Sequence, residues 1–201
     1  MHDAFMAQGY VHAQDRLFQM DFQRRVGAGR LSEVLGEATL KTDQFLRTLG
    51  THRAAELDLQ LLDNDTLASL QAYADGVNAF IEINSKKLPV EFRILGYTPE
   101  PWQPVDTLVW GKMMAWNLGG NWENELMTAR LIEKLGSDKA AELLGRYPTD
   151  GPFIIPPEVK SYSGLNSLDM SAVWAVKRLL GAHDPGVGSN NWVVAGSRTT
   201  T

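Results

Sequence analysis

The sequence predicts a mostly α-helical protein, and three observations support this. Apolar residues recur every three or four positions over long stretches, which is the period of one face of an α-helix. Capping residues, glycines and prolines divide these stretches into segments of helical length. Hydrophobic residues make up 44% of the 201 residues and the net charge is only −5. The chain can therefore bury a core, and a disordered chain is excluded.

The first thirty residues are predicted to form one helix. Its apolar stripe is Tyr10, Ala13, Leu17 and Met20. The opposite side is expected to face solvent and carries Gln14, Asp15, Gln19, Gln23 and Arg24. Helical segments interrupted at Gly36 and Gly50 follow over residues 31–62. Asn64 and Asp65 are expected to cap the next helix, whose inward face is Leu67, Leu70, Tyr73, Val77 and Phe80.

Four prolines between residues 89 and 104 predict an ordered connection without helix, because proline lacks a backbone donor and restricts the residue before it. Asp106 is expected to be the N-cap of the next helix, which ends at Gly119 and Gly120. Two more helices are predicted, one beginning near Asn121 and one over residues 137–144.

The composition changes near residue 145, where prolines, glycines and small polar residues become frequent. We therefore divide the chain into a helical region (residues 1–147), a linker (148–188) and the first strand of a second unit (189–201). The linker is expected to be exposed and to hold one isolated amphipathic helix from Ser171 to Leu180. The strand is predicted from the aromatic and β-branched run that begins at Trp192.

Several classes of function are excluded by composition and motifs. With 24 acidic and 19 basic residues, the chain has no basic patch for nucleic acid, and no apolar run approaches the length that a bilayer requires. There is no cysteine, and the four histidines have no metal-binding spacing. No phosphate-binding loop or G-x-S-x-G motif is present.

The remaining polar and apolar candidates have ordinary structural interpretations. Acidic residues on the predicted helices are interpreted as solvated faces or caps: Asp15, Asp21, Glu33, Glu123 and Glu125. On composition alone, an apolar stripe on the helix after residue 106 is more typical of a core than of a pocket: Met113, Met114, Trp116 and Leu118.

Ser189 is a different case, because it follows Gly188 at the junction between the linker and the predicted strand. Cleavage of the bond between them would make Ser189 a chain terminus with a hydroxyl group and a free α-amino group. The pKa of an α-amino group is about 7.7 to 8.0, so one residue would supply both nucleophile and base. This chemistry needs no catalytic histidine, cysteine or metal.

Two motifs make the chain resemble the penicillin acylase family of N-terminal-nucleophile hydrolases. The sequence G-Y-V-H-A-Q-D-R-L-F-Q-M at residues 9–20 is similar to the opening helix of the family's α subunit. The sequence G-S-N-N-W at residues 188–192 is similar to the start of its β subunit. Shorter similarities lie between them, among them P-E-P-W at residues 99–102 and N-W-E-N-E-L at residues 121–126.

The resemblance implies a fold, a reaction and a set of site residues. The full protein is expected to have an αββα fold, to cut itself before Ser189 and to hydrolyse linear amides through a Ser189 acyl-enzyme. Its substrates would be N-acyl compounds, either N-acyl-homoserine lactones or β-lactams with an acylated amine. Met114, Trp116 and Leu118 would lie near the acyl pocket.

The resemblance also implies cofactors, partners and location. No cofactor is expected for catalysis, whereas a structural calcium ion would be bound by Glu125, with Glu123 as the alternative. The partner would be a β subunit cut from the same precursor, with no nucleic acid and no membrane involved. The periplasm is the expected location, with the cytoplasm as the alternative.

The match to the family is incomplete at both ends of the sequence. The family's α subunits begin before the first helix, and most of a β subunit would follow residue 201. We therefore expect these residues alone to hydrolyse nothing at a useful rate, because the oxyanion-stabilising donors would lie in the β subunit. The alternative interpretation is a non-catalytic helical fragment that acts as a binding or assembly module.

Overall fold

The computed structural model describes residues 2–119, 121–144, 169–180, 193–194 and 198. The elements found there are ten α-helices and one 3-10 helix, so the predicted mostly helical fold is confirmed. Gly188, Ser189 and nearly all of the predicted strand lie outside the described residues. Within the described part of the chain, no helix combines the length and the apolar character that a bilayer crossing needs.

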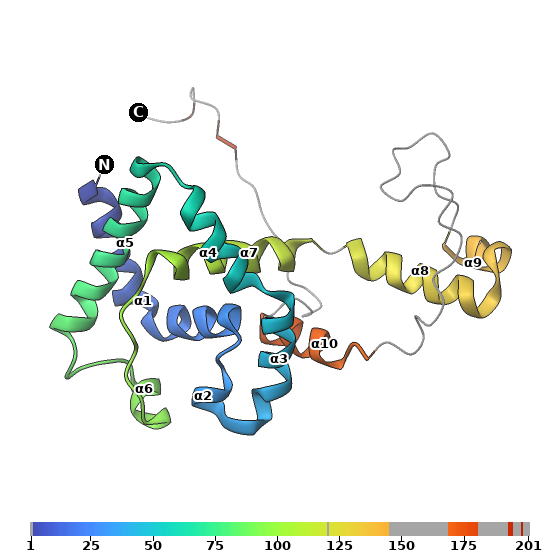
Figure 1. The fold of residues 1–201 in the computed structure, drawn as a ribbon, viewed down its shortest axis with the longest axis horizontal. Helices are drawn as coiled ribbons and strands as arrows, with labels where there is room; N and C mark the ends of the chain where they lie inside the picture. Colours follow the sequence, from blue (N-terminus) through green and yellow to red (C-terminus); the bar gives the residue numbers. More distant parts are fainter. Residues whose placement is uncertain (1, 120, 145–168, 181–192, 195–197, 199–201) are drawn as a thin grey trace.

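Two long helices cross on the left side of the body in Figure 1, α1 (His2–Ala28) and α5 (Asn64–Ile83). Ala13 and Leu17, from the predicted stripe of α1, are buried in the same cluster as Val77 of α5. At Arg16 the backbone leaves helical geometry with φ −154° and ψ 39°, so the predicted single helix is two segments joined by a kink.

The next elements are short and are joined by glycine turns. They are α2 (Ser32–Leu35), a 3-10 helix η1 (Gly36–Thr39), α3 (Leu40–Leu49) and α4 (Thr51–Leu61). Gly50 joins the last two with a φ of 79°, a left-handed conformation that glycine adopts without steric cost. Asp43 of α3 accepts hydrogen bonds from the backbone N–H groups of Leu31 and Ser32, so a side chain from another helix caps α2.

Two predicted helix boundaries are wrong by small amounts, and one short helix was not predicted. The N-cap of α5 is Asp63, whose carboxylate accepts from the N–H of Thr66 at 2.8 Å. The proline-rich connection contains a short helix, α6 (Val90–Leu95), which buries Phe92. The helix α7 (Pro104–Leu118) begins before Asp106, which accepts from the backbone N–H of Gln103 as the third residue of a capping box.

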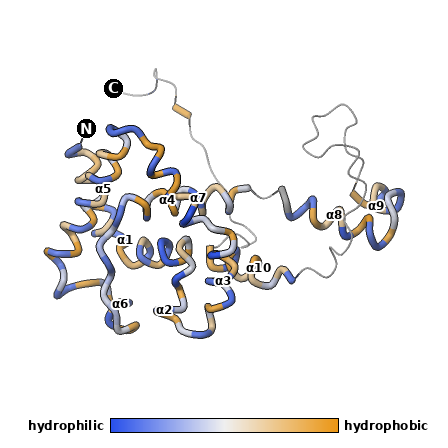
Figure 2. The backbone as a smooth tube through the Cα atoms, in the orientation of Figure 1, coloured by the Kyte–Doolittle hydropathy of each residue, from blue (hydrophilic) through white to orange (hydrophobic). Residues whose placement is uncertain are grey.

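The last helices extend the body to one side. α8 (Asn121–Leu135) and α9 (Ser137–Leu144) pack against each other, and apolar and polar stretches alternate along them in Figure 2.

α10 (Ser171–Leu179) was expected to be isolated, and this prediction is wrong. It packs against α3, because its apolar face finds an apolar surface there, and Val176 is fully buried.

Candidate functional site

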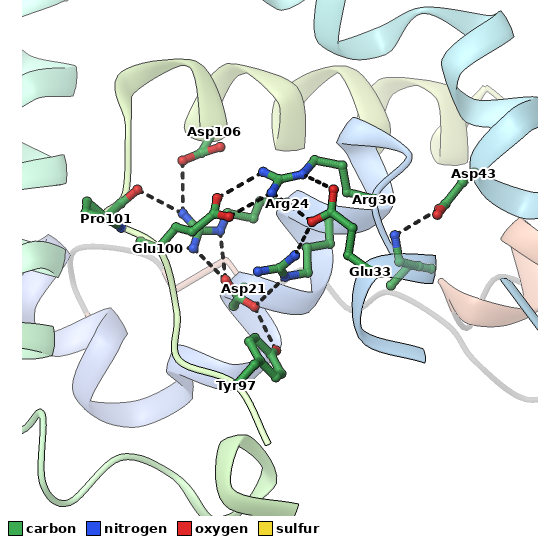
Figure 3. Close-up of polar contacts among 11 residues, drawn as sticks. Asp21, Arg24, Arg30, Glu33, Asp43, Tyr97, Glu100, Pro101 and Asp106 are labelled. Atoms are coloured by element: carbon green, nitrogen blue, oxygen red, sulfur yellow. Dashed lines mark hydrogen bonds and ion pairs between the residues drawn. The ribbon is translucent and has the colours of Figure 1, made fainter. Parts of the chain in front are cut away.

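A buried carboxylate organises the centre of the molecule (Figure 3). Asp21 is only 1% exposed, so its interpretation as part of a solvated helix face is wrong. Its carboxylate accepts hydrogen bonds from Nε of Arg24 at 2.9 Å, from Nε of Arg25 at 2.9 Å and from the hydroxyl of Tyr97 at 2.8 Å. Burial and the bond to this carboxylate raise the pKa of Tyr97, so its hydroxyl stays protonated.

Arg24 ties the connection after α6 to α1. Its guanidinium donates to the backbone carbonyl oxygens of Glu100 at 2.7 Å and Pro101 at 3.1 Å, and to the carboxylate of Asp106 at 3.3 Å. It also lies 5.4 Å from the centre of the Trp102 ring. Arg24 was expected on the solvent side of α1, but it is 6% exposed because four acceptor atoms and an aromatic face surround it.

A third arginine, Arg30, extends this network to the surface. Arg30 donates to the carboxylates of Glu33 and Glu100, with N–O distances between 2.7 and 3.0 Å. These hydrogen bonds hold the pKa of each glutamate below its ordinary value, since they favour the charged carboxylate. The network is structural, because its donors and acceptors satisfy one another.

A groove of about 1010 Å³ runs along α1 between α5 and the start of α7. The indole rings of Trp102 and Trp110 line it, together with Arg16 at the kink. Nδ1 of His12 and the hydroxyl of Tyr73 lie 3.0 Å apart at the same surface. With aromatic faces beside hydrogen-bonding groups, this groove has the composition of a surface that binds a partner.

The three residues expected at the acyl pocket do not share a face of α7. Met114 and Leu118 lie one turn apart and are 47% and 76% exposed. Trp116 lies about 200° around the helix from either of them, at 100° per residue. Its ring is 6.2 Å from that of Phe45, and both rings pack against the core cluster that contains Met113. Met114 and Leu118 therefore form an exposed apolar pair on one face of α7, whereas Trp116 packs against the body on the other face.

The two glutamates expected at a calcium site lie on α8 and face different surroundings. Glu123 is paired with Lys177 of α10, and Glu125 is exposed. Among the described residues there is no group of three or more potential metal ligands. Calcium takes six to eight oxygen ligands, so these residues do not by themselves fit a calcium ion.

The nucleophile expected at Ser189 and the cleavage site at Gly188 fall outside the described residues, and their roles stay predictions. Sequence reasoning missed the buried network around Asp21. A signal for it was present, because Asp21 precedes Arg24 and Arg25 by three and four positions, which is the spacing of ion pairs on a helix.

Comparison with known proteins decides the family. The family model described as penicillin amidase matches residues 1–201. The chain belongs to the penicillin amidase family. It is 36% identical to the acyl-homoserine lactone acylase QuiP of Pseudomonas aeruginosa over 98% of this chain and 24% of that protein. It is 37% identical to the penicillin acylase 2 proenzyme of Pseudomonas sp. (strain SE83) over 99% of this chain and 26% of that protein.

The fold is also that of a penicillin amidase. A solved structure of thermostable penicillin G acylase from Alcaligenes faecalis superimposes with a TM-score of 0.60 and 32% sequence identity, over 76% of this chain and 86% of the solved chain. The present chain spans about a quarter of the length of the curated relatives it matches. The helical body with its central groove is therefore one part of a penicillin amidase.

Proposed function

We propose that the full-length protein is an amidohydrolase that cuts itself between Gly188 and Ser189 and then hydrolyses N-acyl compounds. The observation that carries the proposal is membership of the penicillin amidase family over all 201 residues. The relatives' names support both halves of it, since one is an acyl-homoserine lactone acylase and another is a penicillin acylase proenzyme.

In the proposed cleavage, Oγ of Ser189 attacks the carbonyl carbon of Gly188. The bond from that carbon to the Ser189 nitrogen breaks, an ester forms, and the hydroxyl proton passes to the nitrogen. Water then hydrolyses the ester, which leaves a carboxylate on Gly188 and a free amine and hydroxyl on Ser189. This step makes the nucleophile and its base from one residue.

In the proposed catalytic reaction, the α-amine of Ser189 takes the hydroxyl proton while Oγ attacks the amide carbon of the substrate. The proton passes to the leaving amine, and water hydrolyses the acyl-enzyme. Medium-chain N-acyl compounds are the proposed substrates, with β-lactam side chains second. The exposed pair Met114 and Leu118 supports an apolar acyl site, and location in the periplasm stays a prediction from the family resemblance.

Three measurements on the full-length protein test the proposal: intact mass, N-terminal sequencing, and release of free amine from penicillin G and from acyl-homoserine lactones of increasing chain length. The wild type is expected to contain a chain that begins at Ser189. Ser189→Ala is expected to stay uncut and to lose activity by about 10⁴-fold or more, since it removes the nucleophile.

Ser163→Ala, in the linker, is the matched control and should behave as wild type. An uncut, inactive wild type would contradict the proposal and favour a non-catalytic module.

A further inference from the structure

The helix α10 lies in the predicted linker, yet its apolar face is built into the body. Val176 is 0% exposed and Val173 is 7% exposed. Val176 belongs to the same buried cluster as Leu46 of α3, and the rings of Phe45 and Trp116 pack against that cluster. A short helix with this burial behaves as a core element, because each apolar side chain returned to water loses its favourable transfer free energy.

The polar side of α10 is also tied to the body. The side chain of Lys177 is 3% exposed, and its ammonium group is paired with the carboxylate of Glu123 on α8. The same nitrogen lies 5.9 Å from the centre of the Trp116 ring, within the range of a cation–π contact. Burial lowers the pKa of Lys177 because desolvation disfavours the ammonium ion.

These contacts place α10 between three helices that come earlier in the chain. α3 contributes Leu46, α7 contributes Trp116 and α8 contributes Glu123, a set that we call the α10 seat. In Figure 1, α10 lies next to α3 on the side of the body from which α8 extends. Removing α10 would expose the apolar part of the seat and leave a partly buried carboxylate without its cation, which is costly.

We propose that α10 is a permanent part of the penicillin amidase body and stays in the α10 seat after the chain is cut before Ser189. On this proposal, any peptide lost from the linker excludes Ser171–Leu180. α10 then keeps Trp116 packed and Glu123 paired in the mature protein. The proposal rests on the proposed function in assuming that cleavage occurs, but the retention of α10 is a separate property.

The first test uses the full-length protein after it has processed itself. The sample is passed through gel filtration under native conditions, denatured and examined by intact mass. Residues 171–180 should be found in equal molar amount to the chain that begins at Ser189, either at the end of a longer chain or as a separate peptide. A Ser189 chain without residues 171–180 would overturn the proposal.

A second experiment tests the retention of α10 without relying on self-cleavage. Recognition sequences for a site-specific protease are inserted into full-length Ser189→Ala, one after residue 157 and one after residue 183, and both are cut. The α10 peptide should still elute with the body. Its elution alone would overturn the proposal, whereas failure of the wild type to cut itself would overturn only the proposed function.

Charge reversal identifies the contacts responsible. In the doubly cut protein, Lys177→Glu places a second carboxylate beside Glu123 and should reduce the retained fraction of α10 about tenfold or more. Arg178→Glu is the matched control, because it makes the same change on the exposed side of α10 and should leave retention unchanged. Adding Glu123→Lys to Lys177→Glu should restore retention. Equal retention in the two single variants would show that the pair of Lys177 with Glu123 does not hold α10, and would remove this pair from the contacts that the proposal assigns to the seat.

Discussion

At the scale of single residues, the stability of the fold depends on one buried carboxylate, that of Asp21. Asp21 accepts from two arginines and a tyrosine, and Arg24 carries the same network to the carbonyl oxygens of Glu100 and Pro101. The charges compensate one another inside the protein, so the loss of one partner leaves others buried and unpaired. Such a loss costs far more than a surface ion pair contributes.

Asp21→Asn tests this dependence. The substitution keeps the shape but removes the charge that two buried arginines need, so we expect the free energy of unfolding to fall by about 3–5 kcal/mol. Asp15→Asn makes the same change at an exposed position of the same helix and should cost less than about 0.5 kcal/mol. Urea unfolding followed by circular dichroism measures both, and equal effects would contradict a structural role for Asp21.

The ion pairs of Arg30 with Glu33 and Glu100 should make the stability of the fold depend on pH. The pKa values of Glu33 and Glu100 are lower in the folded state than in the unfolded chain, so the pairs stabilise the fold above about pH 4.3. This stabilisation is lost as the pH falls through the folded pKa values, because both carboxylates become protonated.

The two carboxylates are 43% and 51% exposed, so we expect a contribution of only about 1 kcal/mol at pH 7. Arg30→Gln should be less stable than wild type by this amount at pH 7, and the difference should shrink as the pH falls towards 3. Arg93→Gln, at an exposed arginine, serves as the control. A difference that grows in acid would contradict the assignment.

At the scale of elements, the crossing of α1 and α5 sets the shape of the body. A Cβ atom on Gly9 would overlap the backbone carbonyl of Tyr73, and one on Gly76 would overlap that of Met6. The two helices therefore approach each other backbone to backbone. This close contact buries Ala13 and Ala74 completely and places the kink at Arg16 beside the groove.

Replacing Gly76 or Gly111 by alanine distinguishes the effect of close helix packing on stability from the effect of helix propensity. Gly76→Ala should reduce the free energy of unfolding by about 1–3 kcal/mol, because the added methyl group forces the helices apart. Gly111→Ala lies in the interior of α7 with no atom within 4 Å of the new Cβ, and should increase stability by about 0.5–1 kcal/mol. Thermal melting of the two variants measures the difference, and two shifts of the same sign would be inconsistent with the crossing.

At the scale of the whole molecule, two apolar clusters are joined by α1 and the ionic network. One cluster gathers Phe92 and Trp102 around the α1–α5 crossing. The other gathers Val26, Leu46 and Val176 where α1, α3 and α10 meet. Helix α7 packs on the body through Met113 but presents Met114 and Leu118 outward, so it can hold the fold and offer an apolar surface at once.

Alanine substitution on α7 separates these two roles. Trp116→Ala should destabilise the chain by about 3 kcal/mol, because the indole packs on Phe45 and against a core cluster. Leu118→Ala, at a 76% exposed position, should change stability by less than about 0.5 kcal/mol. In the full-length enzyme, Leu118→Ala is expected to shift the preferred acyl-chain length while leaving the melting temperature unchanged. An unchanged preference would remove Leu118 from the acyl site.

Much of the fold follows from local signals. The helical period, the glycines at positions 36, 50 and 119, and the amphipathic pattern of residues 171–180 predict most helices within a few residues of their positions. The short helix α6 was missed because six residues among prolines carry too little periodicity to recognise. The capping of α2 by Asp43 was missed because its partner lies eleven residues away on another helix.

The sequence by itself determined the helical class, the family motifs and Ser189 as the candidate nucleophile, because these depend on residue type and local spacing. Only the tertiary structure decided that Asp21 and Arg24 are buried, that Trp116 packs on Phe45, and that α10 belongs to the body. Burial and pairing depend on what the folded chain brings against each residue from distant positions. A pattern along one helix gives the direction of a side chain around the axis, but not what it meets there.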